Sequence, residues 1–244
     1  MMKHVKLFLL FIMIICSNWV TYAGPPFTTD DPEPVEYKHW EYYISSINGW
    51  ENSSWSGTLP HFEVNYGVVP NVQLHLLLPM NYGYSHGTMN LGYASTEIGV
   101  KFRFVKETEN VPQIGVFPII QVPTIKNSSF GNGKAQLYLP VWLQKSWGKF
   151  TTYGGGGYWI NPEAGNRNWL FTGWEAQYDF SSILTLGGEL YYHTATDVES
   201  QSSSGFNVGG FVNFTSKFHL IFSMGHSISN NSFFTSYTGL LWTI

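Results

Sequence analysis

Hydrophobic and polar residues alternate at every second position over much of this chain, and this period of two constrains the fold more than any other feature. In the clearest stretch, the side chains that share one face of an extended chain are Ile98, Val100, Phe102 and Phe104, against Glu97, Gly99, Lys101 and Arg103 on the other. Successive side chains of a β-strand point to opposite faces, so the pattern indicates a strand between two different environments. Its recurrence predicts twelve strands, at residues 38–48, 57–67, 71–82, 91–105, 111–123, 134–146, 149–160, 168–179, 183–194, 205–214, 217–226 and 232–244.

The connections between these strands alternate in length. Short turns are predicted at 68–70, 106–110, 147–148, 180–182 and 215–216, and longer polar links at 49–56, 83–90, 124–133, 161–167, 194–204 and 225–231. In outer-membrane barrels the short turns are periplasmic and the long loops lie outside the cell. The sequence therefore predicts an all-β fold, a transmembrane antiparallel up-and-down β-barrel of about twelve strands with both termini in the periplasm.

Composition and the N-terminus support an exported membrane protein. Charged residues make up 11% of the chain, roughly half of what a soluble domain carries. Lys3, Lys6, an apolar run over residues 7–16 and a small-residue site ending at Ala23 predict a signal peptide cleaved near Ala23. Cys16 is the single cysteine and lies in that segment, so disulfides and cysteine metal sites are excluded from the mature chain. The expected division is a signal peptide at 1–23, a periplasmic lead or plug at 24–37 and an outer-membrane barrel at 38–244.

The orientation of the strands follows from the cost of placing charge in lipid. A Lys or Arg that faces lipid near mid-membrane costs roughly 2 to 4 kcal/mol, so Lys101 and Arg103 are expected to point inward. The aromatic residues near strand ends suit interfacial girdles, although some could pack in the lumen: Trp40, Tyr42, Trp147, Trp159, Tyr178 and Trp242. Apolar and polar residues alternate in the last strand up to Ile244, and C-terminal strands of this kind are recognised by the barrel-assembly machinery.

Ionisable residues on the inward phase are the candidate pathway residues, because such groups are costly inside a membrane protein and usually line a pathway or pair with one another. They are Glu41, Glu63, His75, Glu97, Lys101, Arg103, Glu175, Glu189 and His193. If each hairpin is symmetric, a belt forms in which Glu41 faces Glu63, Glu63 faces His75 and His75 faces Glu97. Such a belt favours cations or neutral hydrogen-bonding solutes over anions. We expect Lys101 and Arg103 to pair with Glu97 or Glu175, and we predict no metal and no cofactor.

The acidic residues Asp30, Asp31 and Glu33 are separated by Pro32 and followed by Pro34, which rules out a central strand. They are interpreted as an extended periplasmic lead or as a short plug or gate in the lumen. A solvated linker is favoured over a calcium site or a gate.

The residues after the predicted signal peptide carry a family resemblance. They read GPPFTTDDPEPV over 24–35 and HWEYY over 39–43. This opening resembles a family of predicted bacterial outer-membrane transporters grouped under meta-pathway phenol degradation. The resemblance implies a single barrel over the whole mature chain and an uptake role for small solutes, including aromatic or apolar compounds. The specific part of this resemblance is the opening, whereas the sequence of the barrel body is of a kind common to many barrels.

The function expected is therefore an outer-membrane pore or transporter with a narrow polar lumen, since twelve strands lie between filled barrels of about eight and open ones of about sixteen. Its partners would be outer-membrane lipid, the barrel-assembly machinery and a small-molecule solute, with no nucleic acid at a net charge of −4. The alternatives are a lipase-like barrel hydrolase and a closed structural barrel. An enzyme is disfavoured because Ser85 with His86, and His226 with Ser227, are sequence neighbours that face opposite sides of a strand. The solute, the oligomeric state and the strand register stay open.

Overall fold

A computed structural model describes residues 25–51, 54–85, 87–93, 95–123, 133–229 and 232–244. The predicted signal peptide, with Cys16, lies outside these residues. The strand segments are β1 (Trp40–Glu51), β2 (Ser54–Val69), β3 (Val72–Ser85), β4 (Thr88–Tyr93), β5 (Thr96–Val105), β6 (Gln113–Val116), β7 (Ile119–Val122), β8 (Gln136–Trp147), β9 (Phe150–Ile160), β10 (Trp169–Asp179), β11 (Leu184–His193), β12 (Ser203–Asn213), β13 (Phe218–Ser227) and β14 (Phe233–Thr243). In these ranges no helix is long and apolar enough to cross a membrane.

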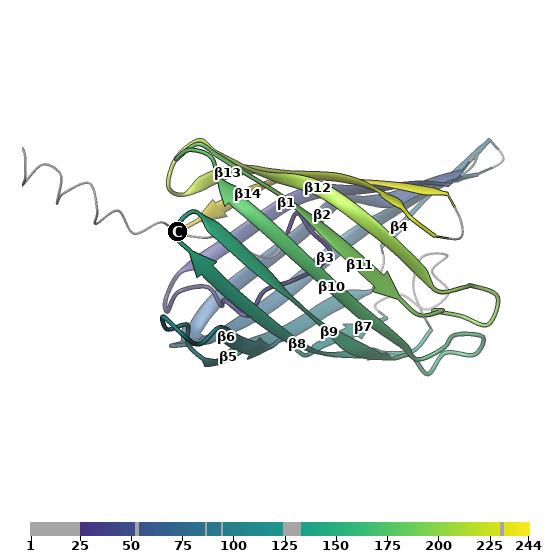
Figure 1. The fold of residues 1–244 in the computed structure, drawn as a ribbon. Coiled ribbons are helices and arrows are strands. Elements are labelled where there is room, and N and C mark those ends of the chain that lie inside the picture. The colour runs from purple at the N-terminus through teal and green to yellow at the C-terminus, as the bar shows by residue number, and fades with distance from the viewer. Residues whose placement is uncertain (1–24, 52–53, 86, 94, 124–132, 230–231) are drawn as a thin grey trace, which may run out of the picture.

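The strands form one antiparallel sheet that closes on itself (Figure 1). β1 pairs with β14 from Glu41 opposite Thr243 to Glu51 opposite Phe233, so the sheet has no free edge along this seam. β4 and β5 are two halves of one strand, and β6 and β7 are halves of another, because each pair lies along the same neighbour. The fourteen segments of the described residues thus make twelve strands across the barrel. The predicted all-β, twelve-stranded antiparallel barrel is confirmed.

The break between β6 and β7 has a local cause. Pro118 follows Val116 and Phe117 and has no N–H to give to the ladder. Its carbonyl still accepts a hydrogen bond of 3.1 Å from the Val100 N–H of β5, so the neighbouring strand remains attached.

The connections differ from the prediction at two of the long links. β1 continues to Glu51 and β2 begins at Ser54, while β3 continues to Ser85 and β4 begins at Thr88, so most of residues 49–56 and 83–90 is strand. The reason is that alternation of side-chain polarity marks only the part of a strand that separates two environments, whereas backbone pairing continues beyond it. Longer connections do separate β7 from β8, β9 from β10 and β11 from β12.

Both ends of the barrel chain lie together. The Trp40 N–H donates to the Ile244 carbonyl at 2.8 Å, and the Thr243 N–H donates to the Lys217 carbonyl in the β12–β13 turn at 2.8 Å. Figure 1 shows the C-terminus at this end of the barrel, beside the short turns. We name it the turn end and the opposite end the loop end.

The outer face is apolar, as the alternation predicts. Val100 and Phe102 of β5 are 39% and 43% exposed, and residues on other strands that share this orientation include Leu74, Leu139, Val141, Trp174, Val208 and Leu240. Lys101, between two of these side chains, is 5% exposed and points inward. Among the aromatics expected at the girdles, Trp40, Trp147, Tyr178 and Trp242 are exposed, whereas Trp159 stacks between Tyr138 and Trp169 inside the barrel.

The inner face is less uniformly polar than expected. One buried apolar cluster comprises Tyr43, Phe211, Ile221, Tyr237 and Leu241, and a second comprises Phe117, Ile119, Tyr138, Trp142 and Phe171. Both clusters come from inward positions of the barrel wall, among buried polar residues such as Gln113, Glu175 and Asn207. The interior therefore combines apolar surfaces with buried polar groups.

Replacing an outward residue near the middle of a strand by lysine tests which face meets lipid. Val100→Lys is expected to lower the free energy of unfolding of the barrel in bilayers by about 2 to 4 kcal/mol, because an ammonium would face hydrocarbon. Urea titration of the heat-modifiable gel band measures it. Val111→Lys is the matched control, since Val111 lies in the β5–β6 turn, where the cost should be at most about 1 kcal/mol. Equal stability of both variants would contradict the assignment of the faces.

Candidate functional site

Residues 25–37, named here the N-terminal segment, run inside the barrel before β1 begins. Thr29 and Asp31 are 0% exposed, and Phe27 and Val35 are also buried. At its end the segment reaches the wall, where Tyr37 forms a parallel bridge with Gly67 of β2. These contacts differ from the solvated linker that the sequence favours, because a solvated chain would expose its carboxylates.

The first part of the segment is bound by the wall of β11, β12 and β13. The two carboxylate oxygens of Glu189 accept hydrogen bonds from the backbone N–H groups of Thr28 at 2.8 Å and Thr29 at 2.7 Å. Asn207 Nδ2 donates to the same carboxylate at 2.6 Å, and Ser223 Oγ donates to the Pro26 carbonyl at 2.6 Å. Glu189 therefore holds backbone groups of the segment, and both of its oxygens accept hydrogen bonds.

The acidic part of the segment is bound by the two cations of β5. Lys101 Nζ lies 2.9 Å from an Asp30 oxygen and 3.4 Å from an Asp31 oxygen, and Arg103 Nη1 lies 3.1 Å from a Glu33 oxygen. Burial raises the pKa of the Asp31 carboxyl, and the nearby ammonium of Lys101 opposes that shift. The expectation that these cations pair with Glu97 or Glu175 of the wall is wrong: their partners come from the N-terminal segment.

Amide side chains of the wall complete the contact around Glu33. Gln113 Nε2 donates to Glu33 at 3.1 Å and Gln144 Nε2 at 3.4 Å, while Gln113 Oε1 accepts from Arg103 at 2.9 Å. The segment thus runs from the β11–β13 wall to the β5, β6 and β8 wall, with hydrogen bonds at both ends. A contact made at two opposite walls fixes a chain across the lumen better than a contact at one.

Two inward glycines make room for the segment. A Cβ added at Gly115 of β6 would lie 3.0 Å from Cβ of Pro32, and one added at Gly173 of β10 would collide with the Thr29 hydroxyl. Thr29 and Pro32 of the segment therefore occupy the space that a side chain at these positions would need.

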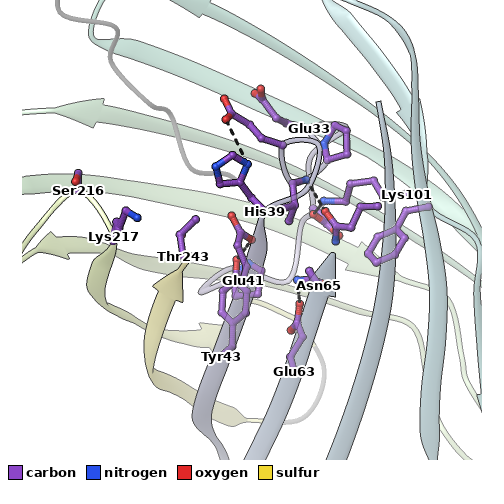
Figure 2. Close-up of a pocket in the computed structure, with 17 residues that line it drawn as sticks. Glu33, His39, Glu41, Tyr43, Glu63, Asn65, Lys101, Ser216, Lys217 and Thr243 are labelled. Atoms are coloured by element: carbon purple, nitrogen blue, oxygen red, sulfur yellow. Dashed lines mark hydrogen bonds and ion pairs between the residues drawn. The ribbon is translucent and has the colours of Figure 1, made fainter. Parts of the chain in front are cut away.

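Two cavities lie on either side of the N-terminal segment. The turn-end cavity has a volume of about 270 Å³, and the residues that line it include Glu33, His39, Glu41, Lys101, Lys217 and Thr243. Figure 2 shows Glu41, Tyr43 and Glu63 below the segment in this space, with Lys101 beside it. The loop-end cavity has a volume of about 450 Å³ and is lined by Phe27, His61, His75, Glu97 and Ile119, among others. Pro25, Asp30, Glu63 and Phe117 line both.

The belt predicted from symmetric hairpins is displaced by two residues. Glu63 pairs with Tyr43 and Leu77, and His75 pairs with Asn65 and Gly99, so the expected partners do not face each other. Diagonal contacts nevertheless bring some members together. His75 Nδ1 lies 3.4 Å from a Glu63 oxygen, and Glu41 accepts a hydrogen bond of 2.9 Å from the Tyr43 hydroxyl.

The other candidate residues lie apart from one another. Glu97 accepts a hydrogen bond of 2.6 Å from Gln121 Nε2 and lines the loop-end cavity. Glu175 is 0% exposed, and neither of its carboxylate oxygens has a hydrogen-bond partner within the described part of the chain. His193 Nδ1 faces the Thr194 carbonyl at 3.0 Å near the end of β11, away from the segment.

Sequence reasoning missed the uncharged members of the site. Asn65, Gln113, Gln144 and Asn207 are all at most 5% exposed and hydrogen-bond to charged residues or the segment. Each occupies the inward phase of its strand, which is a signal that the sequence does contain. An inventory of ionisable residues alone passes over them.

The serine and histidine doublets give no hydrolase geometry in the described residues. His86 lies outside those residues, so its doublet with Ser85 is not described. Ser227 Oγ accepts from the Phe233 N–H, and the contact with His226 Nε2 is made by Ser232 Oγ at 3.3 Å. His226 Nδ1 faces the Ser227 carbonyl at 2.7 Å, where a hydrolase triad would have a carboxylate. The described residues also contain no group of three or more His, Asp or Glu placed to hold a metal ion.

The closed sheet, its apolar outer face and the buried polar groups of its interior define the fold of an outer-membrane β-barrel. No family model matches the chain, and no curated protein sequence matches it. Solved structures do. An outer membrane channel from Pseudomonas putida F1 superposes with a TM-score of 0.73 at 14% identity, over 91% of this chain and 100% of that one.

Two porins are similar over most of their length. The KdgM porin, solved in complex with disordered oligogalacturonate, and the NanC porin each give a TM-score of 0.56 at 9% identity, over 82% of this chain and 98% of theirs. At these identities the likeness concerns the fold.

Proposed function

We propose that the protein is an outer-membrane channel for small solutes, in which the N-terminal segment crosses the lumen and controls passage. The signal peptide predicted at 1–23 would direct export, and both termini would lie in the periplasm at the turn end. Outer-membrane lipid would surround the apolar face, and the alternating strand that ends at Ile244 would be recognised by the assembly machinery.

One observation carries this proposal: the segment divides the interior into two cavities that share part of their lining. A purely structural barrel of this size has no need of hollow space on both sides of a bound chain, and packing the interior with side chains would stabilise it more. Displacing the segment would join the cavities into one passage. The ion pairs of Lys101 and Arg103 hold the closed arrangement.

The solute class of the proposal is small and at least partly apolar. The inner face carries the cluster of Phe117, Ile119, Tyr138, Trp142 and Phe171, and Phe117 borders both cavities. Such a surface suits an aromatic or aliphatic body. The resemblance of residues 24–43 to a family of transporters named for phenol degradation agrees with that chemistry.

Planar-bilayer recording of the purified full barrel tests the proposal. Discrete current steps are expected, together with permeation of small aromatics into liposomes. Absence of both at high protein load, with a heat-modifiable band that shows a folded barrel, would favour a closed structural barrel.

The ionisable residues of the loop-end cavity are expected to set ion preference. Glu63→Gln combined with Glu97→Gln removes two carboxylates from one lining, so the ratio of cation to anion permeability should fall about two- to fivefold, since each carboxylate attracts cations in a confined space. The reversal potential in a salt gradient measures it. Glu199→Gln, on the exposed β11–β12 loop, is the matched control and should change the ratio little. Unchanged selectivity in the double variant would remove these carboxylates from the pathway.

A further inference from the structure

The loop-end cavity is lined by carboxylates and by apolar side chains. We propose that it is a binding site for a small organic ammonium, with neutral hydroxyl compounds of the same shape as weaker ligands and carboxylates excluded. This inference deepens the proposed channel function by naming the solute class, and rests on it for the route by which a bound solute continues past the segment.

His75 belongs to this lining and is held by its neighbours. Asn65 Nδ2 donates to Glu63 at 2.7 Å, which turns Asn65 Oδ1 towards His75 Nδ1 at 2.8 Å. Because Nδ1 faces two oxygens, that of Asn65 and that of Glu63 at 3.4 Å, it carries a proton. Nε2 is buried without a hydrogen-bond partner in the described residues, so His75 is not counted among the acceptors for a ligand.

The acceptor for a ligand is Glu97, which differs from the other carboxylates of this lining. Asp30 is paired with Lys101, and Glu63 contacts His75. Glu97 has the neutral Gln121 as its hydrogen-bond partner, and the salt bridges of the described residues leave it without a cation. No described Lys or Arg lines the cavity. A ligand that supplies a positive charge would complete the site.

Much of the remaining lining of the cavity is apolar. Its lining includes Leu77, Phe117, Ile119 and Tyr237 from the wall, and Phe27 from the N-terminal segment. The volume of about 450 Å³ is within the range of small-molecule sites, about 300 to 1,000 Å³. An inorganic cation would use only the carboxylate, and an apolar solute only the walls. An ammonium on a small ring or aliphatic body uses both.

Three probes of the same size separate these possibilities: benzylammonium, benzyl alcohol and benzoate at neutral pH. Equilibrium binding to the full barrel in a neutral detergent is measured by calorimetry, with micelles alone as the blank. Benzylammonium is expected to bind at least tenfold more tightly than benzoate, with benzyl alcohol between them, because a charge-assisted hydrogen bond is stronger than a neutral one. Benzoate binding as tightly as benzylammonium would overturn the proposal.

Variants at Glu97 test where the preference arises. Glu97→Gln keeps the shape and can still bond Gln121, yet should weaken benzylammonium about tenfold or more and leave benzyl alcohol within about twofold. Glu97→Lys should reverse the preference towards benzoate. Glu199→Gln removes an exposed carboxylate at the same end of the barrel and should leave all three affinities unchanged. Equal loss in the Glu97→Gln and Glu199→Gln variants would reduce the effect to general attraction and overturn the site.

The binding measurement does not require passage, so the two proposals can fail separately. Binding with the expected order but without conductance would refute the channel and leave the site. Conductance without preference for the ammonium would refute the site and leave the channel.

Discussion

A variant that lacks residues 25–37, with residues 1–24 kept for export, is expected to conduct several times more current per channel than the wild-type barrel. The deletion removes the chain that separates the two cavities, and the freed Lys101 and Arg103 would face water in a joined lumen. Single-channel recording at fixed salt measures the change. Liposome swelling should also show that the deletion variant admits larger solutes than the wild type, because the narrowest part of the passage has widened.

A full-length control separates the loss of chain from the loss of charge. In the triple variant Asp30→Asn, Asp31→Asn and Glu33→Gln the segment keeps its size and loses its ionic contacts, so frequent transitions between low and high conductance are expected. Identical single-channel traces for the wild type, the deletion and the triple variant would show that the segment has no part in conduction.

The second large effect concerns Lys101. Lys101→Met leaves Asp31 buried without its cation, and breaking a buried pair on one side costs about 3 to 5 kcal/mol. Arg103→Met should cost less, because its partner Glu33 is 40% exposed in its side chain and still has Gln113 and Gln144 as donors. The population with a displaced segment should therefore rise by roughly 100-fold or more in the Lys101 variant, and clearly less in the Arg103 variant.

Trypsin cleavage after Lys38 reports this population. The Lys38 N–H donates to the Gly67 carbonyl at 2.7 Å, so cleavage requires this part of the chain to leave the wall. When opening is fast relative to cleavage, the rate follows the population of the open form. Lys145→Met is the matched control, because Lys145 pairs with Glu107 away from the segment. Cleavage that is equally fast in the Lys101, Arg103 and Lys145 variants would contradict the assigned strength of the contact.

The barrel could be predicted because each strand carries the alternation of apolar and polar residues on its own, whatever its neighbours are. Val100 and Phe102 on one face and Lys101 and Arg103 on the other already determine orientation, since a cation on the lipid face is costly wherever the neighbouring strands lie. The number of strands follows by repetition. The split of one strand at Pro118 changes its hydrogen bonds and not its path across the barrel.

The register could not be predicted because neither the exact residues of a turn nor a bulge can be read from the pattern. The β2–β3 turn is 70–71 and not 68–70, since Val69 pairs with Val72, and pairing between β1 and β2 shifts between Ser45 and Ile47. Displacements of this size dissolve the symmetric belt of Glu41, Glu63, His75 and Glu97 while their inward direction is kept.

The ion pairs of the site depend on a segment without periodicity. Asp30, Asp31 and Glu33 lie between prolines and carry no strand or helix pattern, so nothing local indicates that they enter the lumen. The sequence does indicate that Lys101 and Arg103 point inward and need anionic partners. The carboxylates that the strand pattern places inside the barrel belong to the wall, so the prediction chose those. The sequence does contain one signal of the segment. Gly115 and Gly173 are inward positions without a side chain, and such positions leave room for another part of the chain next to the wall.

The N-terminal segment is joined directly to β1, which starts at Trp40, three positions after Tyr37. When the segment is released from Lys101 and Glu189, it therefore stays attached to the barrel. Its rebinding would be a first-order, intramolecular step at a high effective concentration. The rate at which the channel closes should therefore not change when the protein is diluted. A separate peptide of the same sequence would have to compete with the segment, which remains covalently attached beside its binding site.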